Sequence, residues 1–142
     1  MSAATVDADA LLCVLILAPR TLPRNRYFSL FEEPRMKRVR RRASRVRGIV
    51  RQLVEGGPNG AQITGEKVLE DGRCLIRYRL PSLAASRTTA LSALEAAALR
   101  YALHRAGAGK LDPKDRRTVE RALAELGVGL EAKRGTPVRE SK

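Results

Sequence analysis

The chain has 142 residues, a length typical of one domain, and 44% of them are hydrophobic, which excludes wholesale disorder. Aromatic residues make up only 4%, so the core must consist mainly of Leu, Val and Ala, which favours a helix-rich fold. The formal net charge is +13. A charge of this size favours polyanionic partners, such as nucleic acid, anionic membrane or acidic protein.

A short apolar run lies near the N-terminus, from Ala10 to Ala18. Its nine residues are too few to cross a bilayer. Asp7 and Asp9 stand where a secretory signal would carry basic residues, and no Ala-x-Ala cleavage site follows. Three interpretations remain open: a buried strand, a docked terminal segment, or an upstream extension from a misassigned start. We therefore treat residues 1–22 as a poorly ordered or docked segment and expect a single folded domain over 23–128.

The segment 34–55 combines a helical apolar pattern with a dense basic surface. Its apolar residues recur at steps of three and four, which predicts one face of a helix: Met36, Val39, Ala43, Val46, Val50 and Leu53. Nine basic residues and no acid lie between positions 35 and 51, namely Arg35, Lys37, Arg38, Arg40, Arg41, Arg42, Arg45, Arg47 and Arg51. Like charges four residues apart repel by about 0.2–0.5 kcal/mol per pair, and a bound polyanion would relieve that repulsion.

The apolar seam of this segment also has the spacing of a coiled coil, but the charges oppose a parallel dimer. With Met36 at position a, Arg35 and Arg42 fall at g and would face Arg40 and Arg47 at e. Both pairs are repulsive, and the seam is shorter than three heptads. We therefore expect the seam to pack against its own domain.

A β-hairpin is predicted over residues 61–80. Asp71-Gly72 is a favoured two-residue turn between two strand-like runs. A turn at this position places Glu66 opposite Arg77 and Val68 opposite Leu75. The other face is then apolar and is the expected core side, with Ile63, Leu69, Cys74, Ile76, Tyr78 and Leu80.

Two helices are predicted to follow. Ser92 and Glu95 form a capping box that begins a helix over 93–105, and Asp112-Pro113 begins a second helix over 113–126. The second helix presents a smaller basic group opposite its apolar face, formed by Lys114, Arg117 and Arg121. We expect the basic tail 129–142 to be flexible. The sequence therefore predicts a small α+β domain of order helix, β-hairpin, helix, helix, with disordered termini.

Candidate catalytic and metal-binding groups are sparse. Cys13, Cys74 and the single His104 provide neither CxxC spacing nor a ligand cluster, which disfavours zinc and a disulfide framework. Residues 107–110 superficially resemble a phosphate-binding loop, but they follow a helix and lack a Ser or Thr after Lys110. We interpret them as a helix C-cap and loop. We expect no catalysis, no metal, no cofactor and no small-molecule substrate.

The function expected from these features is non-enzymatic binding of DNA or RNA, chiefly through phosphates and in a regulatory role. The basic residues of segment 34–55 would supply the main contacts, and those of the last helix a second patch. Arg greatly outnumbers Lys, which favours forked contacts to phosphate. We expect a cytoplasmic protein, with the nucleoid or ribosome as candidate locations.

Two alternatives stay open. The basic helix could dock an acidic protein, which would make the chain an adaptor. It could also be a solvated face without any partner, produced by the Arg-rich composition of a high-GC genome. Binding to an anionic membrane is disfavoured, because the apolar stripe lacks the large side chains that insert well.

Overall fold

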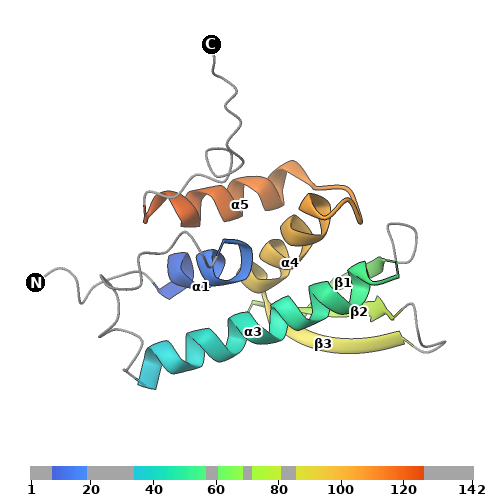
Figure 1. The fold of residues 1–142 in the computed structure, drawn as a ribbon, viewed down its shortest axis with the longest axis horizontal. Helices are drawn as coiled ribbons and strands as arrows, with labels where there is room; N and C mark the ends of the chain where they lie inside the picture. Colours follow the sequence, from blue (N-terminus) through green and yellow to red (C-terminus); the bar gives the residue numbers. More distant parts are fainter. Residues whose placement is uncertain (1–7, 19–33, 57–60, 69–71, 81–85, 127–142) are drawn as a thin grey trace, which may run out of the picture.

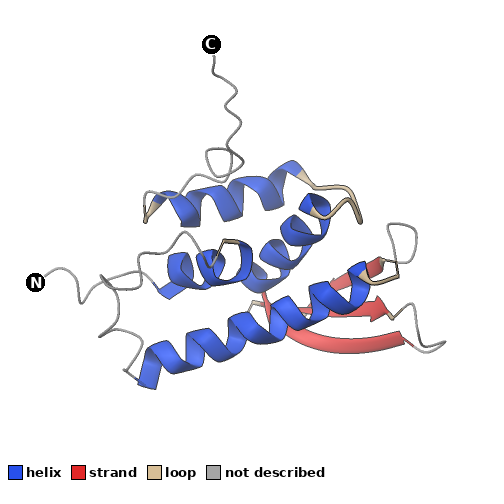
Figure 2. Ribbon diagram, viewed as in Figure 1, coloured by secondary structure: helices blue, strands red, loops and turns tan. Residues whose placement is uncertain are grey.

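The computed structural model describes residues 8–18, 34–56, 61–68, 72–80 and 86–126. Within these ranges the elements follow in the order α1 (Ala8–Leu17), α3 (Pro34–Val54), β1 (Gln62–Lys67), β2 (Arg73–Arg79), β3 (Ser86–Ser92), α4 (Ala93–Arg105) and α5 (Pro113–Ala124) (Figure 1). The helices gather on one side and the three strands form a small antiparallel sheet (Figure 2). The predicted α+β class is confirmed.

The apolar N-terminal run forms the helix α1 at the centre of the core. Leu11, Leu12, Cys13 and Val14 are fully buried, and α1 contacts α3, α4 and α5. Figure 1 shows α1 between α3 and α5. The interpretation of this run as a strand is therefore wrong, whereas the docked segment agrees with the structure. Because helices surround α1 on several sides, it is apolar nearly all round and lacks the one-sided pattern that identifies a surface helix.

Helix α3 confirms the predicted basic helix to within one residue. Met36, Val46 and Leu53 have 0% exposure, and α3 contacts α1 and α4. Ile49 is buried near the C-terminal end of the seam, where Val50 is only partly buried. The seam is thus used inside the domain, as the unfavourable e and g charges of a dimer predicted.

Strands β1 and β2 form the predicted hairpin in a different register. Glu66 lies opposite Leu75 instead of Arg77, a shift of two residues. The N–H of Val68 donates to the carbonyl oxygen of Arg73 at 2.7 Å, so four residues, 69–72, connect the strands instead of two. Exposed charge pairs contribute only about 0.2–1 kcal/mol each, too little to fix the register by themselves.

The two-residue shift leaves every side chain on its predicted face, because side chains alternate along a strand. Ile76 and Tyr78 are buried, as expected for the core side, and Cys74 is partly buried on the same face. Helix α4 contacts β2 and β3. The predicted contribution of Leu69 lies outside the described residues. The sheet therefore has one face in the core and one open face.

The third strand, β3, was not predicted. It pairs antiparallel with β2, which becomes the central strand. Its signal in the sequence was limited to the adjacent β-branched residues Thr88 and Thr89. The strand ends at Ser92, which is also the N-cap of α4, so strand and helix follow without a linker.

Helices α4 and α5 begin where the sequence predicted. The capping box of Ser92 and Glu95 is present, and Asp112 caps α5 by accepting from the N–H of Lys114 at 3.0 Å. Helix α5 ends two residues earlier than predicted, at Ala124, where the N–H of Leu126 bonds three residues back to Leu123.

An ion pair joins α4 to α5. The guanidinium of Arg100 donates two hydrogen bonds to the carboxylate of Asp115, at 2.6 and 3.0 Å. These bonds raise the pKa of Arg100 above its ordinary value, although partial burial acts in the opposite direction. Arg100 therefore holds the two helices together.

No described helix is long and apolar enough to span a membrane.

Candidate nucleic-acid interface

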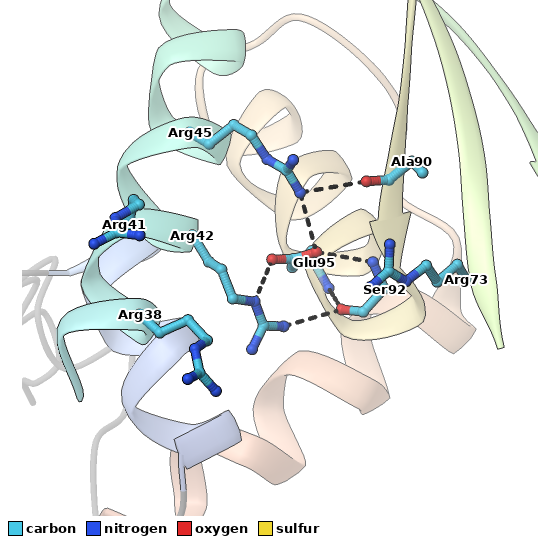
Figure 3. A pocket seen from close by; sticks show the side chains of 8 residues that line it. All are labelled: Arg38, Arg41, Arg42, Arg45, Arg73, Ala90, Ser92 and Glu95. Atoms are coloured by element: carbon cyan, nitrogen blue, oxygen red, sulfur yellow. Dashed lines mark hydrogen bonds and ion pairs between the residues drawn. The ribbon is translucent and has the colours of Figure 1, made fainter. Parts of the chain in front are cut away.

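A basic cleft lies between α3 and the strand β3. Four arginines of α3 line it at the spacing i, i+3, i+4 and i+7, which places them on one side of a helix. The cleft has a volume of about 540 Å³ and is lined by Arg38, Arg41, Arg42, Arg45, Arg73, Ala90, Ser92 and Glu95 (Figure 3). Its lining thus comes from α3, β2, β3 and the first turn of α4.

A buried carboxylate holds one wall of this cleft. Glu95 has 2% exposure, and its Oε1 accepts from the N–H of Ser92 at 2.8 Å. Its Oε2 accepts from Nε of Arg42 at 2.7 Å. A guanidinium nitrogen of Arg45 lies 3.7 Å from Oε1. Burying a carboxylate is costly unless it is paired and hydrogen-bonded, and these contacts meet that need.

Arg42 and Arg45 are oriented by the same group of atoms. Nη2 of Arg42 also donates to Oγ of Ser92 at 3.4 Å, and its side chain is 34% exposed. Nη2 of Arg45 donates to the carbonyl oxygen of Ala90 at 3.3 Å, and its side chain is 50% exposed. Arg42 is therefore chiefly a positioning residue that joins α3 to α4, whereas the sequence predicted a phosphate contact for it as for the other arginines of α3. Arg45 keeps more of its surface open to a ligand.

Arg38, Arg41 and Arg73 carry the unbalanced charge of the cleft. All three are exposed, and within the described part of the chain none forms an ion pair with an acid. Figure 3 shows Arg38 and Arg41 along α3 and Arg73 beyond Ser92. Five arginines thus surround one glutamate. Guanidinium groups form paired, charge-assisted hydrogen bonds with phosphate oxygens, so this cleft suits a phosphate-bearing ligand.

The other predicted contacts are placed differently. Lys37, Arg40, Arg47 and Arg51 are exposed on α3 but do not line the cleft. The side chain of Arg35 lies outside the described residues.

The second predicted patch lies on α5. Lys114, Arg117 and Arg121 are all exposed there. Figure 1 shows α1 between α5 and α3, so the structure does not bring this patch to the cleft.

Sequence reasoning missed Arg73 and the pairing of Glu95 with α3. Arg73 belongs to the cleft because β3 pairs with β2 and brings Ser92 opposite it. Arg73 could not be assigned to the cleft from the sequence, because β3 was not predicted. Glu95 was predicted only as a capping residue. Its Oε1 accepts from the backbone of Ser92 in the cap, while its Oε2 is left to accept from Arg42 of α3.

The remaining polar candidates from the sequence do not line the cleft. His104 is exposed, and its Nδ1 lies 3.0 Å from the carbonyl oxygen of Gly109, to which it donates. Gly107, with a φ of 78°, follows the last turn of α4, as predicted for a helix C-cap. Within the described ranges, no three His, Cys, Asp or Glu side chains are grouped so as to hold a metal ion.

No protein-family model, curated protein or solved structure matches the chain.

Proposed function

We propose that this protein binds nucleic acid without catalysing a reaction, and that the cleft beside α3 contacts the phosphates. One observation carries the proposal: Arg38, Arg41 and Arg73 line one concave surface, and the single acid among its described lining residues is already paired with Arg42. Bringing these cations together costs repulsion, which phosphate oxygens would relieve with release of counterions. The other exposed basic residues of α3 add to the electrostatic attraction for nucleic acid. We propose a cytoplasmic location for such a protein.

The test is a binding titration by fluorescence anisotropy against duplex DNA, single-stranded DNA and structured RNA across a salt series. The informative variant replaces Arg38, Arg41 and Arg73 with Gln. Its matched control replaces Lys67, Arg87 and Lys110 with Gln, which removes the same charge from exposed positions that do not line the cleft.

For the intact protein we expect log K to fall steeply with log salt. Each lost phosphate contact reduces that slope on duplex DNA by about 0.9, so the cleft variant should lose close to 3 and the control much less. Equal slopes for the two variants would mean that net charge, rather than the cleft, governs binding. No binding to any of the three nucleic acids at low salt would overturn the proposal.

The α5 patch is tested separately by replacing Lys114, Arg117 and Arg121 with Gln. Because α1 separates α5 from α3, one short duplex should not contact both surfaces, and this variant should keep most of the slope on such a duplex. If nucleic acid fails to bind but an acidic protein is retained after nuclease treatment, the adaptor function becomes the better explanation.

A further inference from the structure

The open face of the sheet carries a second row of arginines. Side chains alternate along β2, so Arg73, Arg77 and Arg79 point away from the buried pair Ile76 and Tyr78. All three arginines are exposed. Neither Arg77 nor Arg79 forms an ion pair with an acid in the described part of the chain. The row is therefore charged and open to solvent.

The flanking strands place hydroxyl groups beside this row. Thr64 of β1 and Thr88 of β3 are the direct partners of Arg77 on either side, and Ser86 is the partner of Arg79. Opposite residues in antiparallel strands have Cβ atoms about 4.5–5.5 Å apart. Arginine, serine and threonine side chains are common donors to phosphate oxygens. The face thus presents a cluster of phosphate donors on a rigid sheet.

The row is continuous with the cleft, because Arg73 belongs to both. Its cross-strand partner Ser92 accepts from Arg42 of α3. From Arg73 to Arg79 the strand extends about 20 Å at 3.4 Å per residue. From Arg38 to Arg45, α3 extends about 10 Å at 1.5 Å per residue. Together these surfaces could follow about 30 Å of backbone, or about nine base pairs.

We infer that one base-paired nucleic acid binds along both surfaces, with Arg77 and Arg79 as phosphate-contacting residues. The inference rests on the proposed function and adds a second half to that interface. A base-paired partner fits because no aromatic residue among the described ones lies on the open face. Tyr78 belongs to the covered face and Tyr101 is buried in α4. Binding of single strands ordinarily relies on stacking of bases on exposed aromatic side chains.

The experiment compares two double variants that remove equal charge from opposite faces of the same sheet. Arg77→Gln with Arg79→Gln alters the open face. Lys67→Gln with Arg87→Gln is the control, because these exposed residues pair with Cys74 and Tyr78 of the covered face. Each variant is titrated across a salt series with a hairpin stem of about twelve base pairs and with one of about five.

On the long stem, the open-face variant should lose about 2 from the slope of log K against log salt, while the control keeps its slope. On the short stem, which fills little more than the cleft, the two variants should behave alike. Glu66 is the one acid of β1 on the open face, opposite Leu75, so Glu66→Gln should tighten binding to the long stem. Circular dichroism checks that all variants remain folded.

Equal slope losses for the open-face variant and the control on the long stem would overturn the inference. A further titration uses a single strand that cannot form base pairs and has the same number of nucleotides as the long stem. Equal affinity for this strand and the long stem would overturn the assignment of a base-paired partner. In both cases the proposed function survives if Arg38→Gln with Arg41→Gln still reduces the slope. Absence of binding by the intact protein would instead remove the proposed function, and this inference with it.

Discussion

Replacing Glu95 with Gln should destabilise the fold and strengthen nucleic-acid binding at the same time. The side chain is 2% exposed and lies 2.7 Å from Nε of Arg42 and 3.7 Å from a guanidinium nitrogen of Arg45. Gln keeps an oxygen that can accept from the N–H of Ser92, as Oε1 does at 2.8 Å. The substitution therefore removes the charge and largely preserves the helix cap.

The loss of stability follows from the hydrogen bond between charged groups. Such a bond contributes about 1.5–3 kcal/mol when it is well shielded. The Arg42 side chain is 34% exposed, so water screens the pair and solvates the released guanidinium, and about 1–2 kcal/mol is expected. At roughly 4 °C per kcal/mol for a domain of this size, the melting temperature should fall by about 4–8 °C. Glu95→Ala also removes the cap and should cost about 1 kcal/mol more.

The gain in binding follows from the same charge. Glu95 is the only acid among the described residues that line the cleft, and without it Arg42 becomes available to a phosphate. The slope of log K against log salt should become steeper by up to about 0.9. Urea unfolding measures the first effect, and anisotropy titration well below the melting temperature measures the second. Binding that weakens together with stability would refute this reasoning, because it would show that Glu95 must position the arginines for them to bind.

Four further substitutions separate stability from binding. Arg41→Gln should weaken nucleic-acid binding with almost no change in urea stability, because Arg41 is exposed on the cleft wall. Leu12→Ala should cost about 2–5 kcal/mol in urea unfolding, because α1 is core; a neutral result would make α1 a dispensable extension. Gly48→Ala should raise stability by about 0.5–1 kcal/mol, since a Cβ there meets nothing within 4 Å. Asp115→Asn should cost about 1–2 kcal/mol, because Arg100 loses its charged partner, and should leave the binding curve unchanged.

Local signals predicted most of the helical structure from the sequence. The step pattern of α3, the capping box of Ser92 and Glu95, and the Asp112-Pro113 start are determined by neighbours within a few residues. These patterns act through backbone hydrogen bonds and one packed face, so tertiary context changed little beyond the last turn of α5.

The features that the sequence did not reveal depend on contacts between distant segments. Helix α1 is helical within a shell of other helices, and its sequence has no one-sided pattern. The register of the hairpin differs from the prediction by two residues. Strand β3, which pairs along the whole of β2, was not predicted. The lining of the cleft was therefore predicted only in part. Its α3 wall was predicted, but Arg73, Ala90 and the link from Glu95 to α3 required the third strand and the packing of α4.

The grouping of arginines around the cleft argues against an Arg-rich composition as the whole explanation of the basic surface. Compositional bias alone gives no reason for five arginines and a single acid to line the same cleft. In the described part of the chain, Arg100 pairs with Asp115 and Arg116 with Glu120 on the side of α4 and α5. Five arginines line the cleft with one glutamate, which is buried and forms ion pairs with two of them, Arg42 and Arg45. The cleft thus carries net positive charge on a concave surface, where a phosphate ligand would relieve the repulsion between its arginines.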